Sequence, residues 1–139
     1  MQAAEPVRET SVLPQADMHR ILVVDDNRDN ADSLAMMLRL MGTEVGAAYD
    51  GEQALELAAT RQPQVILLDI GIPRLDGYEV CRRIRQQSWG KAIVIIALTG
   101  WGQQEDRARS LEAGFDHHLV KPVDAAELVE VLGQLHRAA

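Results

Sequence analysis

Apolar runs alternate with amphipathic stretches from Arg20 to the end of the chain. The runs are short and rich in Val, Ile and Leu, as strands are, and they lie at Ile21–Val24, Val45–Ala48, Val65–Leu68, Ile93–Leu98 and His118–Val120. The third and fourth runs are almost continuously apolar, which is typical of strands buried on both faces of a sheet. The pattern therefore predicts five strands.

The stretches between these runs have the spacing of helices. Apolar residues recur there every three to four positions, and the predicted helices are Asn30–Met41, Glu52–Thr60, Tyr78–Gln87, Gln103–Ala113 and Asp124–His136. Asp50 and Asp124 are the expected N-caps of the second and fifth helices. Gly42 and Gly114 follow the first and fourth helices and are expected to end them.

The apolar faces of the last two helices differ in width. The fourth helix is polar apart from Ala108 and Leu111, so we expect it to be loosely held and easy to reposition. The fifth helix has a broader face, which we expect to point inward and which consists of Leu128, Val131, Leu132 and Leu135.

Five strands that alternate with five helices imply right-handed βαβ units and a parallel sheet covered by helices on both faces. The alternation alone does not fix the order of the strands. The 139 residues, 47% of them hydrophobic, suffice for one buried core. Residues 1–18 lack periodicity and contain Pro6 and Pro14, so we expect a flexible tail there and one domain over residues 19–139.

The net charge of −7 argues against direct, non-specific binding of nucleic acid, which needs a basic surface. It fits a protein that binds a cation or a basic partner. The longest purely apolar run, Ala92–Leu98, is far too short to insert into a membrane. The amino-terminal residues contain no apolar stretch of the secretory type. Together with the single cysteine, Cys81, these features favour a cytoplasmic location.

Charged and hydroxyl side chains follow four of the predicted strands. Asp25 and Asp26 end the first strand and Asp69 the third, while Thr99 ends the fourth and Lys121 the fifth. The carboxyl ends of parallel strands share one edge of the sheet, and ligands of open α/β sheets bind outside that edge. We therefore expect three carboxylates, one hydroxyl and one ammonium group to converge.

Such a cluster needs a cation. Two carboxylates about 4 Å apart repel each other by roughly 4 kcal/mol at an effective dielectric constant near 20. Mg²⁺ suits a site with few carboxylates that also shares a phosphate, and Mn²⁺ is the alternative cation. Three carboxylates, one divalent cation and Lys121 sum to zero charge, and such a site could receive a phosphoryl group.

Each feature also has a simpler interpretation when it is taken alone. Asp25 and Asp26 are compatible with a solvated turn that caps a helix, and Asp69 with a loop-capping acid. Thr99 fits a strand end, and Lys121 fits a surface lysine before a turn. The joint placement on successive strand ends favours a shared site.

Other candidate residues carry weaker signals. His117 and His118 are neighbours on a predicted strand, so their side chains point to opposite faces, which argues against a shared metal site. Cys81 fits a packing residue. Trp101 fits either a partner-docking aromatic or a residue that covers the helix after it. The sequence contains neither GxGxxG nor GxxxxGK[ST], the glycine-rich loops that hold nucleotide phosphates.

Four segments resemble the motif set of bacterial response-regulator receiver domains: ILVVDDN, VILLDIGIPRLDGYEV, ALTG and AGFDHHLVKPVD. The resemblance runs from about Arg20 to His136. It implies a flavodoxin-like (CheY-like) fold with five helices and the strand order 2-1-3-4-5. It also implies a phospho-accepting signalling domain of a two-component system or phosphorelay, which is not an enzyme apart from catalysing its own phosphorylation and dephosphorylation.

The resemblance assigns a role to each candidate residue. Asp69 matches the phosphoacceptor, which attacks the phosphohistidine of a histidine kinase or histidine phosphotransfer protein. Asp26 and Asp25 match metal ligands, and Gly71 would supply its backbone carbonyl. Thr99 matches the switch hydroxyl. The downstream partner would be a protein that reads the surface around the fourth and fifth strands and helices.

The last two motif positions complete this assignment. Lys121 matches the lysine that pairs with a phosphoryl oxygen, and the bond before Pro122 is usually cis in the family.

Three positions depart from the usual pattern of the family. His118 stands where a switching Tyr or Phe is common, and a histidine is smaller and titrates near neutral pH. Gly71 stands where a larger side chain is common, and Trp101 lies two residues after Thr99. Both bear on the lifetime of the phosphoryl group through the access of water.

Two other functions fit parts of the pattern. An aspartate-nucleophile phosphohydrolase typically has a second acid two residues after the nucleophile, where this chain has Gly71. A receiver-like scaffold that works without phosphorylation would not need Asp69, Asp26, Thr99 and Lys121 together. The sequences of the motifs most resemble those of receivers in hybrid sensor histidine kinases. The alternative is a stand-alone regulator. We expect no output domain after the last predicted helix within these 139 residues.

Overall fold

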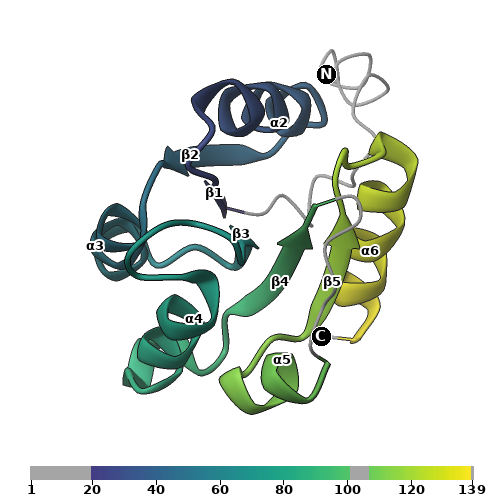
Figure 1. The fold of residues 1–139 in the computed structure, drawn as a ribbon. Helices are drawn as coiled ribbons and strands as arrows, with labels where there is room; N and C mark the ends of the chain where they lie inside the picture. Colours follow the sequence, from purple (N-terminus) through teal and green to yellow (C-terminus); the bar gives the residue numbers. More distant parts are fainter. Residues whose placement is uncertain (1–19, 101–106, 139) are drawn as a thin grey trace.

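A computed structural model describes residues 20–100 and 107–138 (Figure 1), and the side chains of these except residues 107 and 134–138. The expected tail over residues 1–18, Trp101 and the part of the predicted fourth helix before Arg107 lie outside the described residues.

The strands and helices alternate along the described chain as the sequence predicts. The strands are β1 (Arg20–Val24), β2 (Glu44–Ala48), β3 (Val65–Asp69), β4 (Val94–Thr99) and β5 (His117–Val120). The helices are α2 (Arg28–Leu40), α3 (Gly51–Arg61), α4 (Gly77–Arg85), α5 (Arg107–Ala113) and α6 (Ala125–Ala138), with a short 3₁₀ turn, η2, at Ser88–Gly90.

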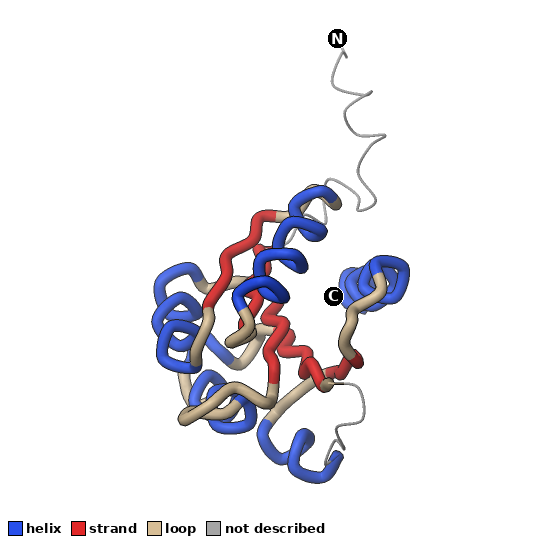
Figure 2. The backbone as a smooth tube through the Cα atoms, turned by 45° about the horizontal axis from the view of Figure 1, so that its top comes forward, coloured by secondary structure: helices blue, strands red, loops and turns tan. Residues whose placement is uncertain are grey.

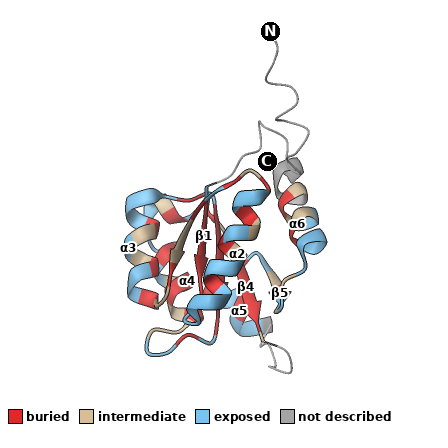
Figure 3. Cartoon of the chain, turned by 90° about the horizontal axis from the view of Figure 1, so that it is seen from above, coloured by how far each residue is buried: buried red, intermediate tan, exposed pale blue. Residues whose placement is uncertain are grey.

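The five strands are all parallel and lie in the order β2-β1-β3-β4-β5. This confirms the expected flavodoxin-like fold. Leu22 of β1 lies opposite Ile66 of β3, which lies opposite Ile95 of β4. The helices form a layer on each side of the sheet, with α3 and α4 on one side and α2 and α6 on the other (Figures 2 and 3).

Alternate residues of the central strands pack against the helix layers on the two faces of the sheet. One face packs against α3 and α4, and its buried members include Leu22, Ile66, Ile95, Ala54, Ala58, Val80 and Ile84. The other face packs against α2 and α6, and its buried members include Val23, Leu67, Ile96, Ala35, Leu38, Leu128 and Leu132. Each fully buried Leu or Ile contributes about 1.5–3 kcal/mol, so this double core fixes the sheet and the positions of its strand ends.

Side-chain caps set the starts of the helices. Asn27 accepts a hydrogen bond from the Asn30 N–H, and α2 therefore begins two residues before the predicted Asn30. Asp50 caps α3, as predicted, by accepting from the Gln53 N–H at 2.7 Å. Gly42, at φ 97°, adopts the left-handed backbone that commonly follows a helix end.

The apolar face expected for the fourth helix is wrong. Ala108 and Leu111 are exposed, Leu111 by 76%, whereas Ser110 and Ala113 are buried among the side chains described for α5. Ser110 and Ala113 are three residues apart and share one face of the helix. The small side chains on that face let the helix approach its neighbours closely, and α5 packs mainly against α4.

None of the helices in the described parts of the chain is both long and apolar enough to cross a membrane.

Candidate functional site

The carboxyl edge of the sheet brings three acidic side chains together. Asp25 follows β1 directly, Asp26 comes next, and Asp69 is the last residue of β3, the neighbour of β1. One carboxylate oxygen of each lies within 4.8 Å of the others. Asp25 is 2% exposed and Asp69 is 5% exposed, whereas Asp26 faces solvent. Two buried acids side by side need compensating charge.

Lys121 supplies part of that charge. Its Nζ lies 3.1 Å from Asp69 Oδ2 and 3.3 Å from Asp25 Oδ2, so one ammonium group bridges the two buried acids. Lys121 follows β5 directly, and its backbone N–H donates to the Thr99 carbonyl at 2.7 Å. The next peptide bond, before Pro122, is cis, as the resemblance implies.

Backbone N–H groups hold the other oxygens of the buried acids. Asp25 Oδ1 accepts from the Asn27 N–H at 3.0 Å, and Asp69 Oδ1 accepts from the Gly71 N–H at 2.9 Å. The Asp25 N–H itself donates to the Ala48 carbonyl of β2. The acids are therefore fixed by the loops that carry them.

Burial and charge act in opposite directions on these groups. Burial raises the pKa of Asp69 above its ordinary value, and the hydrogen bonds from Gly71 and Lys121 only partly counter it. For Lys121, burial favours the neutral amine, but the hydrogen bond and charge of Asp69 and the charge of Asp25 outweigh it and raise the pKa. Lys121 is therefore charged at neutral pH, and it is one ammonium group beside three acidic side chains.

The start of α4 lies directly against the backbone of Asp69. A Cβ on Gly77 would lie 2.7 Å from the Asp69 carbonyl oxygen and 2.5 Å from Ile70 Cα. Asp76 caps the helix by accepting from the Glu79 N–H. Only glycine allows this close approach, so Gly77 helps to set the position of the acid.

The remaining candidates lie on neighbouring strands. Thr99 ends β4, one residue beyond the partner of Asp69 in the register, and is 2% exposed with its hydroxyl 3.5 Å from the Leu119 carbonyl. His118 lies on β5 two residues before the level of Thr99 and is half-buried, and His117 is exposed.

The donor set fits a hard divalent cation. Among the side chains that the structure describes, a group of three acidic, His or Cys residues close enough to share an ion occurs at Asp25, Asp26 and Asp69. All three offer oxygen atoms, which are the ligands that Mg²⁺ prefers, and the cluster carries excess negative charge. The residues present therefore fit the cation that the sequence predicts.

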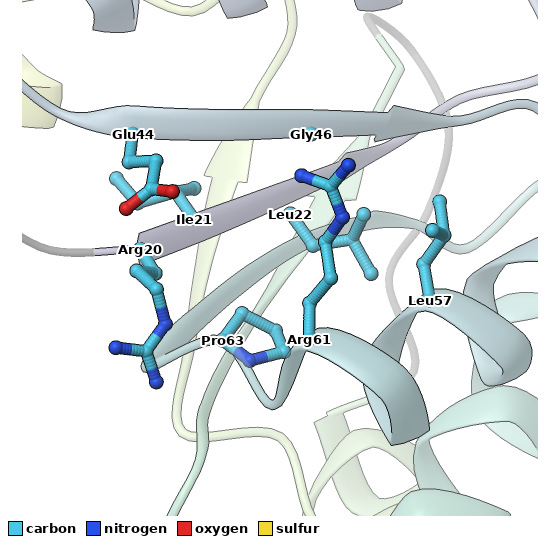
Figure 4. Close-up of a pocket in the computed structure, with 8 residues that line it drawn as sticks. All are labelled: Arg20, Ile21, Leu22, Glu44, Gly46, Leu57, Arg61 and Pro63. Carbon is cyan, nitrogen blue, oxygen red and sulfur yellow. The ribbon is translucent and has the colours of Figure 1, made fainter.

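Two of the pockets in the described chain lie at opposite ends of the strands. A pocket of about 450 Å³ opens beside the acidic cluster; it reaches Asp25 and Lys121 and has apolar walls that include Leu34, Met37 and Val123. A second hollow, of about 380 Å³, lies where β1 and β2 begin (Figure 4), with its lining residues Arg20, Ile21, Leu22, Glu44, Gly46, Leu57, Arg61 and Pro63. Figure 4 shows the Arg61 side chain reaching toward Gly46. Because ligands of these sheets bind at the carboxyl ends of the strands, the first pocket is the one relevant to the cluster.

The sequence interpretation missed the supporting role of two residues. The signal for Gly77 was available, because an Asp-Gly pair directly before an amphipathic helix marks a cap and a close approach. Tyr49, the residue after β2, contacts both Arg28 and Asp32 of α2. No sequence pattern points to Tyr49, since its contacts cross from one βα unit to another.

The amino-acid sequence is similar to those of known proteins. Residues 21–133 match the model of the response regulator receiver domain. A 14.6 kDa protein of Leptolyngbya boryana is 39% identical over 114 residues, which are 82% of this chain and 87% of that protein. Response regulator MprA of Mycobacterium ulcerans is 42% identical over 118 residues, which are 85% of this chain and 50% of MprA. The chain thus spans about half the length of the MprA relatives that it matches.

Solved structures of the same fold are also similar in sequence. The receiver domain of the sensor histidine kinase PA1611 from Pseudomonas aeruginosa, which has a magnesium ion in its active-site cleft, is 40% identical with a TM-score of 0.76. That match covers 84% of this chain and 96% of the other. Chemotaxis protein CheY4 of Vibrio cholerae is 29% identical with a TM-score of 0.78, over 84% of this chain and 98% of CheY4.

Three observations point to the same family. They are the parallel sheet in the order β2-β1-β3-β4-β5, the acidic cluster at its carboxyl edge and the family match over residues 21–133. The chain belongs to the response regulator receiver domain family, the phosphorylation-accepting domains of two-component signalling.

Proposed function

We propose that Asp69 is the phosphoacceptor of this receiver domain. The observation that carries the proposal is the bridge from Lys121 Nζ to Asp69 Oδ2 and Asp25 Oδ2, at 3.1 and 3.3 Å. The bridge places a cation beside the carboxylate that would react. Asp69 also ends a fully buried strand, and its Oδ1 atom is held by the Gly71 N–H, so the carboxylate is fixed before any donor arrives.

The reaction transfers a phosphoryl group between two protein side chains. A carboxylate oxygen of Asp69 attacks the phosphorus of a phosphohistidine, and a P–O bond forms as the P–N bond breaks. The electron pair of the P–N bond stays on the imidazole nitrogen, which takes up a proton from solvent. The product is an aspartyl phosphate, a covalent intermediate of the kind that carboxylate nucleophiles form. In this proposal the chain transfers the group only to and from its own Asp69 and does not act as an enzyme on other substrates.

Asp25, Asp26 and Asp69, with the backbone carbonyl of Gly71, would hold Mg²⁺, or Mn²⁺ in its place. A bound divalent cation supplies positive charge that offsets the carboxylates and the incoming phosphate. The excess of acid over base in the cluster supports this assignment. The related PA1611 receiver, with magnesium in its cleft, supports it as well.

Thr99 and Lys121 would bind the phosphoryl oxygens after transfer. Phosphorylation replaces one negative charge with about two and adds acceptor oxygens, and the Lys121 ammonium and Thr99 hydroxyl can follow that change. Because the Lys121 N–H donates to the Thr99 carbonyl, the two residues would respond together. His118, which lies two residues before Val120, the partner of Thr99 in the register, would pass the change to the surface around β4, β5, α5 and α6.

The phosphoryl donor would be a histidine kinase or a histidine phosphotransfer protein. The pocket beside Asp25 and Lys121 has apolar walls from α2 and from Val123, and an apolar centre beside charged groups is typical of a protein–protein interface. The net charge of −7 supports a downstream protein target rather than direct contact with nucleic acid. We place these exchanges in the cytoplasm.

The likeness to the PA1611 receiver supports an origin in a hybrid sensor histidine kinase. Within such a protein, or in a stand-alone regulator, residues 19–139 would form the receiver and residues 1–18 a linker.

The test is the intact mass of the protein after incubation with acetyl phosphate or phosphoramidate, with and without Mg²⁺. Wild type should gain one phosphoryl group only with Mg²⁺, and Asp69→Asn should gain none. Asp76→Asn is a matched control, because Asp76 caps α4 and lies outside the acidic cluster.

A gain that persists in Asp69→Asn would assign the phosphoacceptor to another residue. No gain by folded wild-type protein from either donor or from a phosphorylated histidine phosphotransfer protein would favour a scaffold that works without phosphorylation.

A further inference from the structure

Tyr49 joins the end of β2 to the start of α2 through two contacts. The guanidinium carbon of Arg28 lies 4.0 Å from the centre of the Tyr49 ring, a cation–π distance. The Tyr49 hydroxyl donates to Asp32 Oδ1 at 2.7 Å. Arg28 and Asp32 are four residues apart and therefore lie on one face of the first turns of α2.

The segment Asp25–Asn27 lies between β1 and α2 and carries two of the proposed cation ligands. At its start, the Asp25 N–H donates to the Ala48 carbonyl, which belongs to the residue just before Tyr49. At its end, Asn27 caps α2, and Arg28 follows directly. Two consecutive residues, Ala48 and Tyr49, thus hold the segment from both sides.

Tyr49 is itself fixed in place. Its backbone N–H donates to Gln53 Oε1 at 2.9 Å, and its ring is partly buried against the core. By contrast, among the described residues no side chain donates a hydrogen bond to the carboxylate of Asp26. The position of Asp26 therefore depends on the backbone of its own segment, which Tyr49 supports.

We propose that Tyr49 is a positioning residue for the cation site, holding the Asp25–Asn27 segment in the geometry that the ion requires. The inference rests on the proposed cation site and adds to it a residue that touches neither the ion nor the phosphoryl group. Groups that orient metal ligands from outside typically change metal affinity by 10-fold or more when they are removed, and Tyr49 acts one contact further away.

Tyr49 is also the cleanest of the three residues to alter. Changing Arg28 or Asp32 would alter the charge beside an acidic site and so change cation affinity whatever their structural role. Replacing the neutral Tyr49 leaves the charge of the site unchanged. Any effect on affinity then reports on geometry.

The experiment is isothermal titration calorimetry of the full chain with MgCl₂ at constant ionic strength. Tyr49→Leu, which removes the ring and the hydroxyl, should raise the Kd for Mg²⁺ about fivefold or more. Tyr49→Phe keeps the ring under Arg28 and loses only the hydroxyl. It should raise the Kd for Mg²⁺ by about half as much as Tyr49→Leu when the two changes are compared as logarithms. Urea unfolding of each variant in metal-free buffer gives its free energy of unfolding, which shows how far the substitution weakens the fold as a whole.

Thr43→Val is the matched control. The Thr43 hydroxyl donates to the Leu38 carbonyl at 2.7 Å and secures the other end of α2, again without a charge. Its Kd for Mg²⁺ should stay within about twofold of wild type even if its stability falls as far as that of Tyr49→Leu.

An unchanged Kd in Tyr49→Leu would overturn the inference, and so would equal weakening in Thr43→Val, because affinity would then follow overall stability. The proposed cation site is tested separately by Asp26→Asn. If wild type does not bind Mg²⁺, or if binding survives in Asp26→Asn, the site itself is wrong and the inference falls with it.

Discussion

At the scale of single residues, the site pairs Asp69 with Lys121. Burial disfavours the ionised form of Asp69, whereas the neighbouring carboxylates favour the charged form of Lys121. Burial raises the pKa of Asp69, so the folded protein holds a proton on this residue to higher pH than the unfolded chain does. The stability that Asp69 contributes is therefore complete below the unfolded pKa of about 3.9 and is lost as the pH rises through the folded pKa.

Asp69→Asn should accordingly be more stable than wild type at pH 7 in metal-free buffer, because the variant removes the buried charge. The difference in the free energy of unfolding should narrow as the pH falls toward 4, where wild-type Asp69 takes up a proton. Urea unfolding at both pH values measures it. A variant that is less stable than wild type by the same amount at both pH values would contradict the assigned direction of the shift.

Cys81 shows the same effect of burial on a thiol. The residue is 0% exposed inside α4, and burial raises its pKa to about 12. We expect native protein at pH 8 to react with a thiol reagent at least about 100-fold more slowly than a free cysteine, since the thiolate is the reactive form. In 6 M guanidinium chloride the same protein should react within minutes. Rapid, stoichiometric labelling of the native protein would show that the thiol is accessible.

At the scale of elements, one side chain joins α4 to the segments around it. Arg85, the last residue of α4, is 20% exposed and donates to the Gly114 carbonyl, to the Gly90 carbonyl and to Asp116 Oδ2 at 2.7–3.0 Å. Asp116 Oδ2 in turn accepts from the Ile95 N–H of β4. Arg85 therefore links α4, η2, β4 and the turn before β5.

Arg85→Met should lower the free energy of unfolding by about 3 kcal/mol, because it leaves several half-buried acceptors without a donor. Arg83→Met is the matched control: it removes the same charge from the same helix but breaks only a surface ion pair with Glu79, in which the Arg83 side chain is 50% exposed. We expect that change to cost under about 0.5 kcal/mol. Urea unfolding compares the two, and equal losses would refute a special role for Arg85.

The strands and helices were largely predictable from the sequence, and the errors in their prediction have local causes. The alternation of apolar runs predicted every strand to within one residue at each end. The first helix began two residues early because Asn27, not a later residue, provides the cap. The face of α5 was misjudged because small and polar residues, Ser110 and Ala113, pack inward while Leu111 lies in solvent. Hydrophobicity alone does not report how closely two helices approach.

At the scale of the whole molecule, the site was predictable because the topology makes it. Parallel strands put Asp25, Asp69, Thr99 and the start of the Lys121 loop at one edge of the sheet, so their positions at strand ends predicted that shared edge. That β1 lies beside β3 came from the strand order that the family resemblance implies. The support around them was not predictable in this way. Tyr49 acts through contacts between different βα units, and these depend on the angles at which helices pack.

This convergence of charge predicts how the whole fold responds to a divalent cation. In metal-free protein, Asp25 and Asp69 share one ammonium group and Asp26 has none. An ion that binds only the folded state stabilises it by RT ln(1 + [L]/Kd), about 2.7 kcal/mol at 100 times the Kd. For a domain of this size we expect Mg²⁺ at that concentration to raise the Tm by roughly 10 °C.

Differential scanning calorimetry over a series of MgCl₂ concentrations measures this response, with NaCl at matched ionic strength as the control for screening. Asp26→Asn should lose most of the increase in Tm, because it removes a proposed ligand, and this residue is exposed and makes no hydrogen bond to another side chain in the described chain. Its metal-free Tm should equal or exceed that of wild type, because the change removes one of the three charges that repel one another. A Tm that rises equally with NaCl, or equally in Asp26→Asn, would mean that general screening rather than a specific ion relieves the repulsion among the three acids.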